Sequence, residues 1–200
     1  SRSISTTEYL ISSSVWGSVF FDIINHMGGP TQYRARLTIA IGGAILYNKK
    51  KVKGWRDMRI LATGFEPFGG EEVNPSWMAV SRLSEDVKGA EIIKKQLPVV
   101  YFRAFEVLEG YIKEYRPDVV LLTGQAGGSD AVRIERVGIN LCEGRIPDNA
   151  GVKLVGDPID PEGPAAYFST FPFRAMLAKA EETGVPVRFS YSAGTYLCNH

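Results

Sequence analysis

A cysteine stands near the carboxyl end of the sequence, in the segment FSYSAGTYLCNH (189–200). This segment predicts a strand that runs through small residues into the first turn of a helix, with Cys198 at that turn. The N–H groups and the positive dipole of a helix N-terminus favour a thiolate, as a nucleophilic cysteine requires. Ser192, Ala193 and Gly194 would let a substrate approach and would leave N–H groups for a developing oxyanion. The alternative is a structural thiol, because unpaired cysteine is among the most buried residue types.

Two charged side chains are candidates to act with this thiol. Glu135 lies among apolar residues in VRIERVGIN (132–140), where a carboxylate costs free energy unless it is paired. Arg136 points to the opposite face of that strand, so a partner for Glu135 must come from elsewhere. Arg145 follows the next expected strand, in EGRIPDN. A solvent-facing edge position for Glu135 and an ordinary surface location for Arg145 are the alternatives.

A general base is harder to find in the sequence. Cysteine hydrolases usually employ histidine, and the chain has two, His26 and His200. His200 is two residues from Cys198, and helix positions with that spacing do not face each other. His26 lies in an irregular leader. Neither histidine is well placed by a local argument.

Alternating strand and helix patterns must position these residues. Strands are predicted at 59–64, 91–99, 119–124, 132–140 and 185–194, and helices from Asn74 with Pro75 as the first helical residue, over 101–115 and over 172–184. This order predicts an α/β protein, a three-layer α/β/α sandwich with a largely parallel twisted sheet.

Ligand sites in such sheets gather at the carboxyl ends of the strands. Four predicted strand exits contain glycine: TGFEPFGG, TGQAGG, VGIN and YSAGTYLC. The first of them carries Phe65 and Phe68, which form either a local packing lid or an aromatic platform for a ligand. A site at this edge of the sheet would therefore combine an aromatic loop with the cysteine.

Composition favours one intracellular α/β domain, with or without an extension. The chain has 200 residues, of which 44% are hydrophobic, enough to build a core. Residues 58–200 hold fifteen Lys and Arg against nineteen Asp and Glu, which argues against a nucleic-acid partner. Cys142, expected in the core, and Cys198 form no metal spacing and no disulfide framework. We therefore expect a cytoplasmic protein with reduced thiols and without a metal or other cofactor.

Residues 1–57 form an unassigned leader that differs in composition from residues 58–200. They hold eight Lys and Arg against three Asp and Glu, and the shift falls at 49–57. The apolar run at 37–47 is too short to span a bilayer, so a strand or a buried turn of helix is expected there. A membrane-associated anchor is the alternative for this leader.

Several long blocks closely resemble one enzyme family. They are MRILATGFEPFGG with the following NPS, TGQAGG, RIERVGIN with GRIPDN, AYFSTFP and YSAGTYLCN, and they run in register from Met58 to His200. The family is pyroglutamyl peptidase type I, also called pyrrolidone-carboxylate peptidase, whose members are cysteine peptidases that remove an N-terminal pyroglutamyl residue. The resemblance implies the same three-layer fold, incomplete at its carboxyl end, and the dimers or tetramers common in the family.

The resemblance also implies roles for single residues. Cys198 corresponds to the nucleophile, Glu135 to the acidic member of a Cys–His–Glu triad, and Arg145 to an active-site arginine near the thiolate. The residues that correspond to the pocket for the lactam ring are Phe65, Phe68, Asn74 and Gln125. Two phenyl faces and an amide suit a flat, uncharged lactam, whereas a charged glutamate would lack a counter-ion.

Two features depart from the family pattern. The family's catalytic histidine comes in a later strand, after the last residue printed here, so we expect this chain to be inactive unless a longer product exists. Met58 stands where family members begin, so the leader is expected to be translated upstream sequence, a fusion or the tail of a neighbouring membrane protein, with an accessory segment as the alternative. A non-catalytic lactam-binding module is the alternative to a peptidase.

Overall fold

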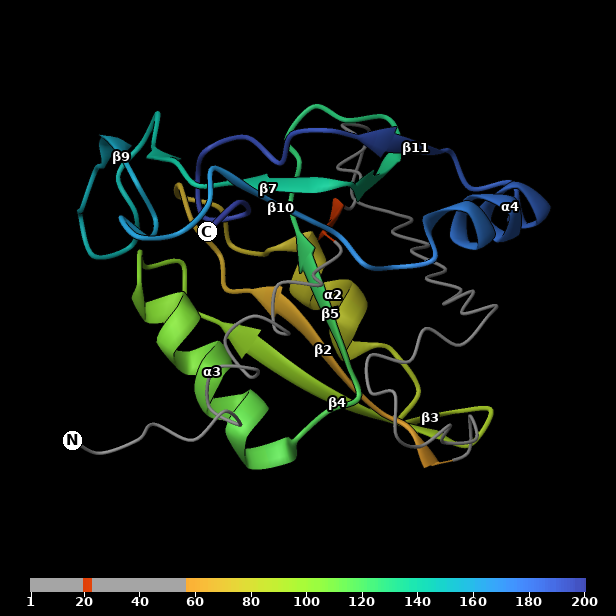
Figure 1. Ribbon diagram of the computed structural model, residues 1–200. Helices are drawn as coiled ribbons and strands as arrows, with labels where there is room; N and C mark the ends of the chain where they lie inside the picture. The colour runs from red at the N-terminus through yellow and green to blue at the C-terminus, as the bar shows by residue number, and fades with distance from the viewer. Residues whose placement is uncertain (1–19, 23–56) are drawn as a thin grey trace.

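A computed structural model describes residues 20–22 and 57–200, with a seven-stranded sheet at the centre (Figure 1). The strands of this sheet are β1 (Phe20–Asp22), β2 (Arg59–Phe65), β3 (Asp86–Val87), β4 (Ala90–Leu97), β5 (Val119–Gly124), β6 (Val132–Glu135) and β11 (Val187–Ser190). The helices are α2 (Pro75–Ser81), α3 (Arg103–Tyr115) and α4 (Phe173–Thr183). Two small sheets pair β7 (Val137–Ile139) with β10 (Ala166–Phe168), and β8 (Cys142–Glu143) with β9 (Val155–Asp157).

The large sheet is mostly parallel, in the order β11-β6-β1-β5-β2-β4-β3. β2 runs parallel to β4 and β5, β1 parallel to β5, and β6 parallel to β11. Only β3 against β4 and β1 against β6 are antiparallel among the described pairs of this sheet. β1 belongs to the leader and lies between β5 and β6, whereas His26 and the apolar run at 37–47 fall outside the described residues.

Alternate residues of the central strands face two separate apolar clusters. Leu61 and Leu122 pack with residues of α3 in one cluster. Ile60 and Leu121 pack with Val80 of α2 in the other. Because successive side chains of a strand point to opposite faces, α2 and α3 cover opposite sides of the sheet. The predicted α/β/α sandwich is confirmed.

Helix α4 covers the same face as α2. Ile134 of β6 packs with Met176 of α4, and Phe171 contacts both this cluster and the cluster around α2. Phe173 at the start of α4 meets Phe189 of β11 edge to face, with ring centroids 5.4 Å apart. One layer therefore consists of α2 and α4, and the opposite layer contains α3.

The start of α2 forms as the sequence predicts. Asn74 is the N-cap, and its Oδ1 accepts the Ser76 N–H at 3.0 Å. Pro75 follows as the first helical residue, where a missing N–H costs nothing. This local chemistry fixes where the chain leaves the loop after β2 and enters the helix.

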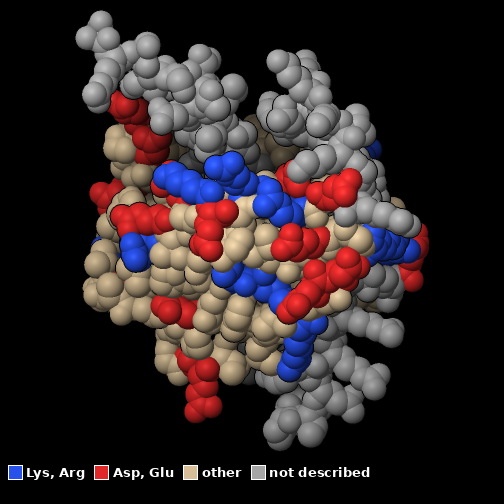
Figure 2. Space-filling view, turned by 90° about the horizontal axis from the view of Figure 1, so that it is seen from below, with Lys and Arg blue, Asp and Glu red and all other residues tan. Residues whose placement is uncertain are grey.

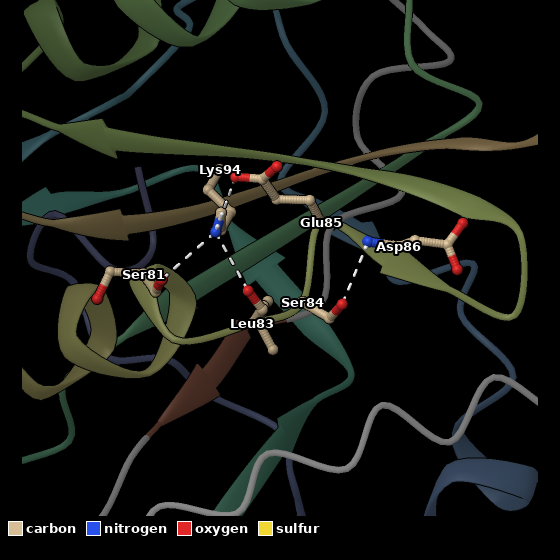
Figure 3. Close-up of polar contacts among 6 residues, drawn as sticks. All are labelled: Ser81, Leu83, Ser84, Glu85, Asp86 and Lys94. Atoms are coloured by element: carbon tan, nitrogen blue, oxygen red, sulfur yellow. Dashed lines mark hydrogen bonds and ion pairs between the residues drawn. The ribbon is translucent and has the colours of Figure 1, made fainter.

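A lysine from β4 donates to carbonyl groups at and just beyond the carboxyl end of α2 (Figure 3). The Lys94 ammonium donates to the Leu83 carbonyl at 3.1 Å and to the Ser81 carbonyl at 3.5 Å. Its Nζ also lies 3.8 Å from a carboxylate oxygen of Glu85. A cation at this position interacts favourably with the carbonyl end of the helix and ties α2 to the sheet.

Two segments differ from the sequence-based expectation. Residues 132–140, predicted as one strand, divide at Arg136 into β6 and β7, which belong to different sheets. The Arg136 carbonyl accepts the Ser169 N–H, and its own N–H donates to Ser190, so the chain changes partners there. Between residue 143 and α4, where no strand was predicted, the structure also has β9 and β10.

The described surface has mixed charge. On the face seen in Figure 2, Lys and Arg side chains lie among Asp and Glu side chains. None of the helices in the described part of the chain has the length and apolar character needed to cross a bilayer.

Candidate active site

Strand alternation places Glu135 and Cys198 on the same face of the sheet. Ile134 faces the α4 side, so Glu135, the next residue, faces the α3 side. Cys198 packs against the apolar cluster on that side, which includes Leu197. Glu135 is 1% exposed, so a solvent-facing edge position is wrong for this carboxylate, whereas Cys198 is half-buried. A buried carboxylate and an accessible thiol thus share one side of the sheet.

Cys198 lies in a hydrogen-bonded turn over residues 197–199. The Asn199 N–H donates to the Tyr196 carbonyl at 2.9 Å, and the His200 N–H donates to the Leu197 carbonyl at 3.3 Å. These bonds span three residues, as in a 3₁₀ turn. Stabilisation of a thiolate by a helix dipole at this turn stays a prediction.

The small residues before this turn bind one another. The Gly194 N–H donates to the Ser192 hydroxyl at 3.2 Å, and the Ser192 N–H donates to the Ser190 hydroxyl at 3.4 Å. Gly194 has φ = +81°, a conformation that favours glycine. The N–H groups of residues 192 and 194, expected to serve an oxyanion, are thus occupied in this conformation.

Two side chains attach the Cys198 turn to the segment between Glu135 and Arg145. The Thr195 hydroxyl donates to the Glu143 carbonyl at 2.8 Å, and the Glu143 N–H donates to the Thr195 carbonyl at 2.7 Å. At the other end of the turn, the Asn199 side chain forms three hydrogen bonds with the backbone of residues 139–141. The nucleophile candidate is therefore held at both ends of its turn.

Tyr196 connects this turn to the aromatic loop after β2. Its ring centroid lies 6.0 Å from that of Phe68 and 5.6 Å from that of Tyr101, and its hydroxyl donates to the Pro147 carbonyl at 3.1 Å. Burial, with a contribution from Cys198, raises the pKa of Tyr196 to about 12, so the phenol is neutral at physiological pH. Sequence reasoning missed Tyr196, because an aromatic in a turn carries no signal of its own.

Arg145 lies between two residues that contact Tyr196. A Cβ at Gly144 would lie 3.3 Å from Cδ2 of Tyr196, and the Pro147 carbonyl accepts the tyrosine hydroxyl. Arg145 itself is exposed. The backbone on both sides of Arg145 therefore lies next to Tyr196 of the Cys198 turn.

The aromatic loop is fixed by its own side chains. Phe65 is buried in the α3-side cluster, and Phe68 packs against the same cluster while remaining partly exposed. The Asn74 amide donates to the Glu66 carbonyl at 3.0 Å while its oxygen caps α2. Asn74 thus orients the loop that carries both phenylalanines, and a direct contact with a ligand remains a prediction.

Gln125 offers a hydrogen-bond acceptor at the end of β5. The residue is half-buried, and its Oε1 is buried without a hydrogen bond from the described residues. Buried amide oxygens are normally paired, so this atom is suited to accept an N–H from a ligand.

The single histidine in the described ranges, His200, is not presented as a base. Its ring meets Phe102 at 4.9 Å and Tyr101 at 5.9 Å between centroids, and burial lowers its pKa to about 4. The second thiol, Cys142, is 0% exposed, and burial raises its pKa to about 11, which confirms the expectation of a core residue. Within residues 20–22 and 57–200, no cluster of three or more His, Cys, Asp or Glu side chains could hold a metal.

Comparison with known proteins decides the family. The family model described as pyroglutamyl peptidase matches residues 58–200. The chain belongs to the pyroglutamyl peptidase family. The resemblance of the sequence blocks is thereby confirmed, and the family consists of cysteine peptidases.

Individual relatives agree over the same part of the chain. A pyrrolidone-carboxylate peptidase of Thermococcus onnurineus is 49% identical over 142 residues, which cover 71% of each chain. One from Streptomyces coelicolor is 50% identical over 143 residues, 71% of this chain and 66% of the relative. The crystal structure of pyroglutamyl peptidase I from Bacillus amyloliquefaciens matches with a TM-score of 0.70 and 46% identity, over 72% of this chain and 69% of that one.

Proposed function

We propose that this protein hydrolyses N-terminal pyroglutamyl residues from peptides, with Cys198 as the nucleophile. The observation that carries the proposal is the placement of Cys198 and Glu135 on one face of the sheet, in a chain that belongs to the pyroglutamyl peptidase family. The half-buried thiol and the fully buried carboxylate match the nucleophile and the orienting acid of a triad.

The lactam ring would lie between the aromatic loop and the cysteine turn. Phe68, Tyr196 and Cys198 all pack against the apolar cluster that contains Phe65, and the Phe68 and Tyr196 rings lie 6.0 Å apart between centroids. Gln125 Oε1 would accept the lactam N–H. A free glutamate would bring a charge into this apolar surrounding without a counter-ion, so the site would reject it.

The reaction divides into two steps. The Cys198 sulfur attacks the acyl carbon of the pyroglutamyl residue, the peptide C–N bond breaks, and the amine leaves with a proton. Water then attacks the thioester, releases pyroglutamate and restores the thiol. The exposed Arg145 at the edge of the turn would favour the thiolate by its positive charge.

The base that takes the thiol proton comes from outside the described residues. The His200 ring faces Tyr101 and Phe102, and its low pKa reflects an apolar environment, which supports this part of the proposal. Glu135 would orient the imidazole of such a base, as the acid of a Cys–His–Glu triad does. We therefore expect residues 57–200, without a histidine from outside them, to turn over substrate slowly or not at all.

The test is release of β-naphthylamine from pyroglutamyl-β-naphthylamide. The 200-residue chain is compared with a version extended through the next histidine-bearing strand, each with and without Cys198→Ser. We expect turnover by the extended version that disappears with Cys198→Ser. Equal, Cys198-dependent turnover by both versions would contradict the assignment of the base.

A lactam-binding module without chemistry is the second candidate, favoured by Gln125 Oε1 and the Phe68–Tyr196 pair, which need no base. Titration with pyroglutamyl-amide separates the two: binding without turnover in either version supports the module. Absence of both binding and turnover would exclude both functions.

The proposal extends to a cytoplasmic location and to assembly as a homo-oligomer. Both cysteines are thiols, which supports a reducing compartment such as the cytoplasm. Exposed apolar side chains such as Val155, Phe168 and Tyr191, each about 70% exposed, support a homo-oligomer. Sedimentation at several concentrations would measure the oligomeric state.

A further inference from the structure

The Asn199 side chain binds the end of β7 in addition to its strand partner β10. The Ile139 N–H donates to Asn199 Oδ1 at 2.9 Å, and Asn199 Nδ2 donates to the carbonyls of Ile139 at 2.7 Å and Leu141 at 3.1 Å. Both polar groups of Ile139 are thus paired by one amide, much as a neighbouring strand would pair them. Asn199 is only 3% exposed, so water does not compete for these bonds.

The position of this amide matters because it adjoins the thiol. Asn199 follows Cys198 directly, and Ile139 is the last residue of β7, four residues after Glu135. A Cβ at Gly138 would lie 3.9 Å from both Asn199 O and Oδ1, so the turn packs directly on β7. One connection from the segment after Glu135 to the thiol therefore runs through the Asn199 side-chain amide.

The start of β7 is itself held in place. The Arg136 N–H donates to the Ser190 carbonyl at 2.8 Å, and the Arg136 carbonyl accepts the Ser169 N–H at 3.0 Å. The Arg136 guanidinium carbon lies 3.4 Å from the centroid of the Phe173 ring, on the opposite side of the sheet from Glu135. Because β7 is held in this way, the hydrogen bonds of Asn199 determine how the Cys198 turn lies on β7.

We propose that Asn199 is a positioning residue, which holds the Cys198 turn against β7 and so sets where the thiol lies relative to Glu135. Its side-chain hydrogen bonds go to Ile139 and Leu141 and not to the aromatic loop or Gln125, and Thr195 anchors the other end of the turn through Glu143. The inference rests on the proposed function only where it calls Cys198 the nucleophile.

The neighbouring Asn140 provides a matched control. Its Oδ1 accepts the Asp160 N–H at 2.8 Å, and its Nδ2 donates to the carbonyls of Asp160 at 2.6 Å and Gly163 at 3.4 Å. It has the same chemistry and the same number of bonds as Asn199, but it binds a loop that does not carry the thiol. Asn140→Ala therefore reports the cost of losing such an amide without moving Cys198.

The test measures iodoacetamide labelling of both thiols in the 200-residue chain, resolved by peptide mass spectrometry. Asn199→Ala should raise the Cys198 rate about fivefold or more and leave buried Cys142 unchanged, because the turn opens locally. Asn199→Asp keeps the size but directs a carboxylate at two carbonyls, so it should behave in the same way. Asn140→Ala should change neither rate.

Other results would overturn the positioning role. Equal acceleration of Cys142 and Cys198 in Asn199→Ala would show a merely structural residue, because global unfolding exposes both thiols. A wild-type labelling rate in Asn199→Asp would show that the two donated bonds do not hold the turn. These outcomes need no peptidase activity, so they are distinct from a failure of the proposed function.

In an active, extended version, Asn199→Ala should lower kcat about tenfold or more while KM stays within about twofold, because the lactam contacts remain intact. A raised KM at unchanged kcat would contradict the inference. Asn140→Ala should leave both constants unchanged.

Discussion

Glu66 and Asn149 join the aromatic loop to the loop that carries Arg145. A Glu66 carboxylate oxygen accepts the Asn149 amide at 2.8 Å and the Val99 N–H at 2.9 Å. The same amide also donates to the Pro67 carbonyl at 2.9 Å. The pair thus fixes the two sides of the proposed lactam site relative to each other, far from the thiol in sequence but at the same edge of the sheet.

The first prediction concerns this pair. Glu66→Ala and Asn149→Ala should each lower the free energy of unfolding by about 1 kcal/mol, since each removes hydrogen bonds between loops. The double variant should lose less than the sum, by about 0.5 kcal/mol or more, because the two residues act on one contact. Urea denaturation measures all four proteins.

Glu72→Ala, an exposed carboxylate of the same loop, is the control and should be near neutral. Strict additivity of the Glu66 and Asn149 substitutions would mean that the bond contributes nothing in solution. Glu66→Gln keeps one acceptor oxygen, so it should lose less stability than Glu66→Ala.

The sequence predicted the framework of this site better than its internal contacts. The strand at 119–124 and the Asn74–Pro75 helix start follow from local pattern, and the structure has both. The break between β6 and β7 at Arg136 and the hydrogen bonds of Asn199 and Glu66 do not follow from local sequence pattern. Asn199 and Ile139 are 60 residues apart, and Glu66 and Asn149 are 83 apart, so these contacts arise only when strands meet and leave no periodic signal.

The candidate site residues show the same difference between what local sequence pattern predicts and what only the folded chain reveals. Burial of Glu135 among apolar neighbours was one of two open alternatives, and only the position of its strand in the sheet decides it. The hydrogen bonds that attach the Cys198 turn to β7 and β8 come from residues distant in sequence, so no local pattern predicts them. Tyr196 could be recognised only once its ring was seen against Phe68.

The second prediction concerns recognition of the lactam. Gln125→Leu keeps the side-chain volume but removes the buried oxygen, so affinity for pyroglutamyl-amide should fall about tenfold. An analogue with CH₂ in place of the lactam N–H should bind wild type and variant alike. Calorimetric titration of both ligands measures the difference.

Gln96→Leu, on β4, is the matched control and should leave both affinities unchanged. Equal loss of affinity for both ligands in Gln125→Leu would indicate a change of pocket shape. In that case the Oε1 atom is not the acceptor of the lactam N–H.

The third prediction concerns the close packing of β2 on α2. A Cβ at Gly64 would lie 2.6 to 2.7 Å from backbone atoms of Ser76 and Trp77, which cannot move without shifting α2. Gly64→Ala should therefore lower the free energy of unfolding by about 2 kcal/mol or more. The loop that carries Phe65 should shift as well, with weaker lactam binding.

Gly110 provides the opposite case for the same substitution. It lies inside α3 with no atom within 4 Å of an added Cβ, so Gly110→Ala should stabilise the protein by about 0.5 to 1 kcal/mol. Thermal and urea unfolding of both variants measure whether the free energy of unfolding falls in Gly64→Ala and rises in Gly110→Ala. A neutral Gly64→Ala would show that β2 and α2 are less tightly packed than the structure has them.

The fourth prediction follows from the buried ring of His200. Its pKa is about 4 in the folded protein and near 6.5 when unfolded, so the unfolded state binds more protons between these values. Stability should therefore fall as pH drops from about 6.5 towards 4, by on the order of 3 kcal/mol from this group.

His200→Phe keeps the aromatic contact with Phe102 but cannot titrate. The difference in unfolding free energy between wild type and variant should be constant above pH 7 and should grow in favour of the variant below pH 6. Urea denaturation at several pH values measures this difference, in which the acid sensitivity of carboxylates common to both proteins cancels. Parallel curves down to pH 4 would show that the imidazole is already accessible to protons in the folded protein, and it would then regain its candidacy as a base beside Cys198.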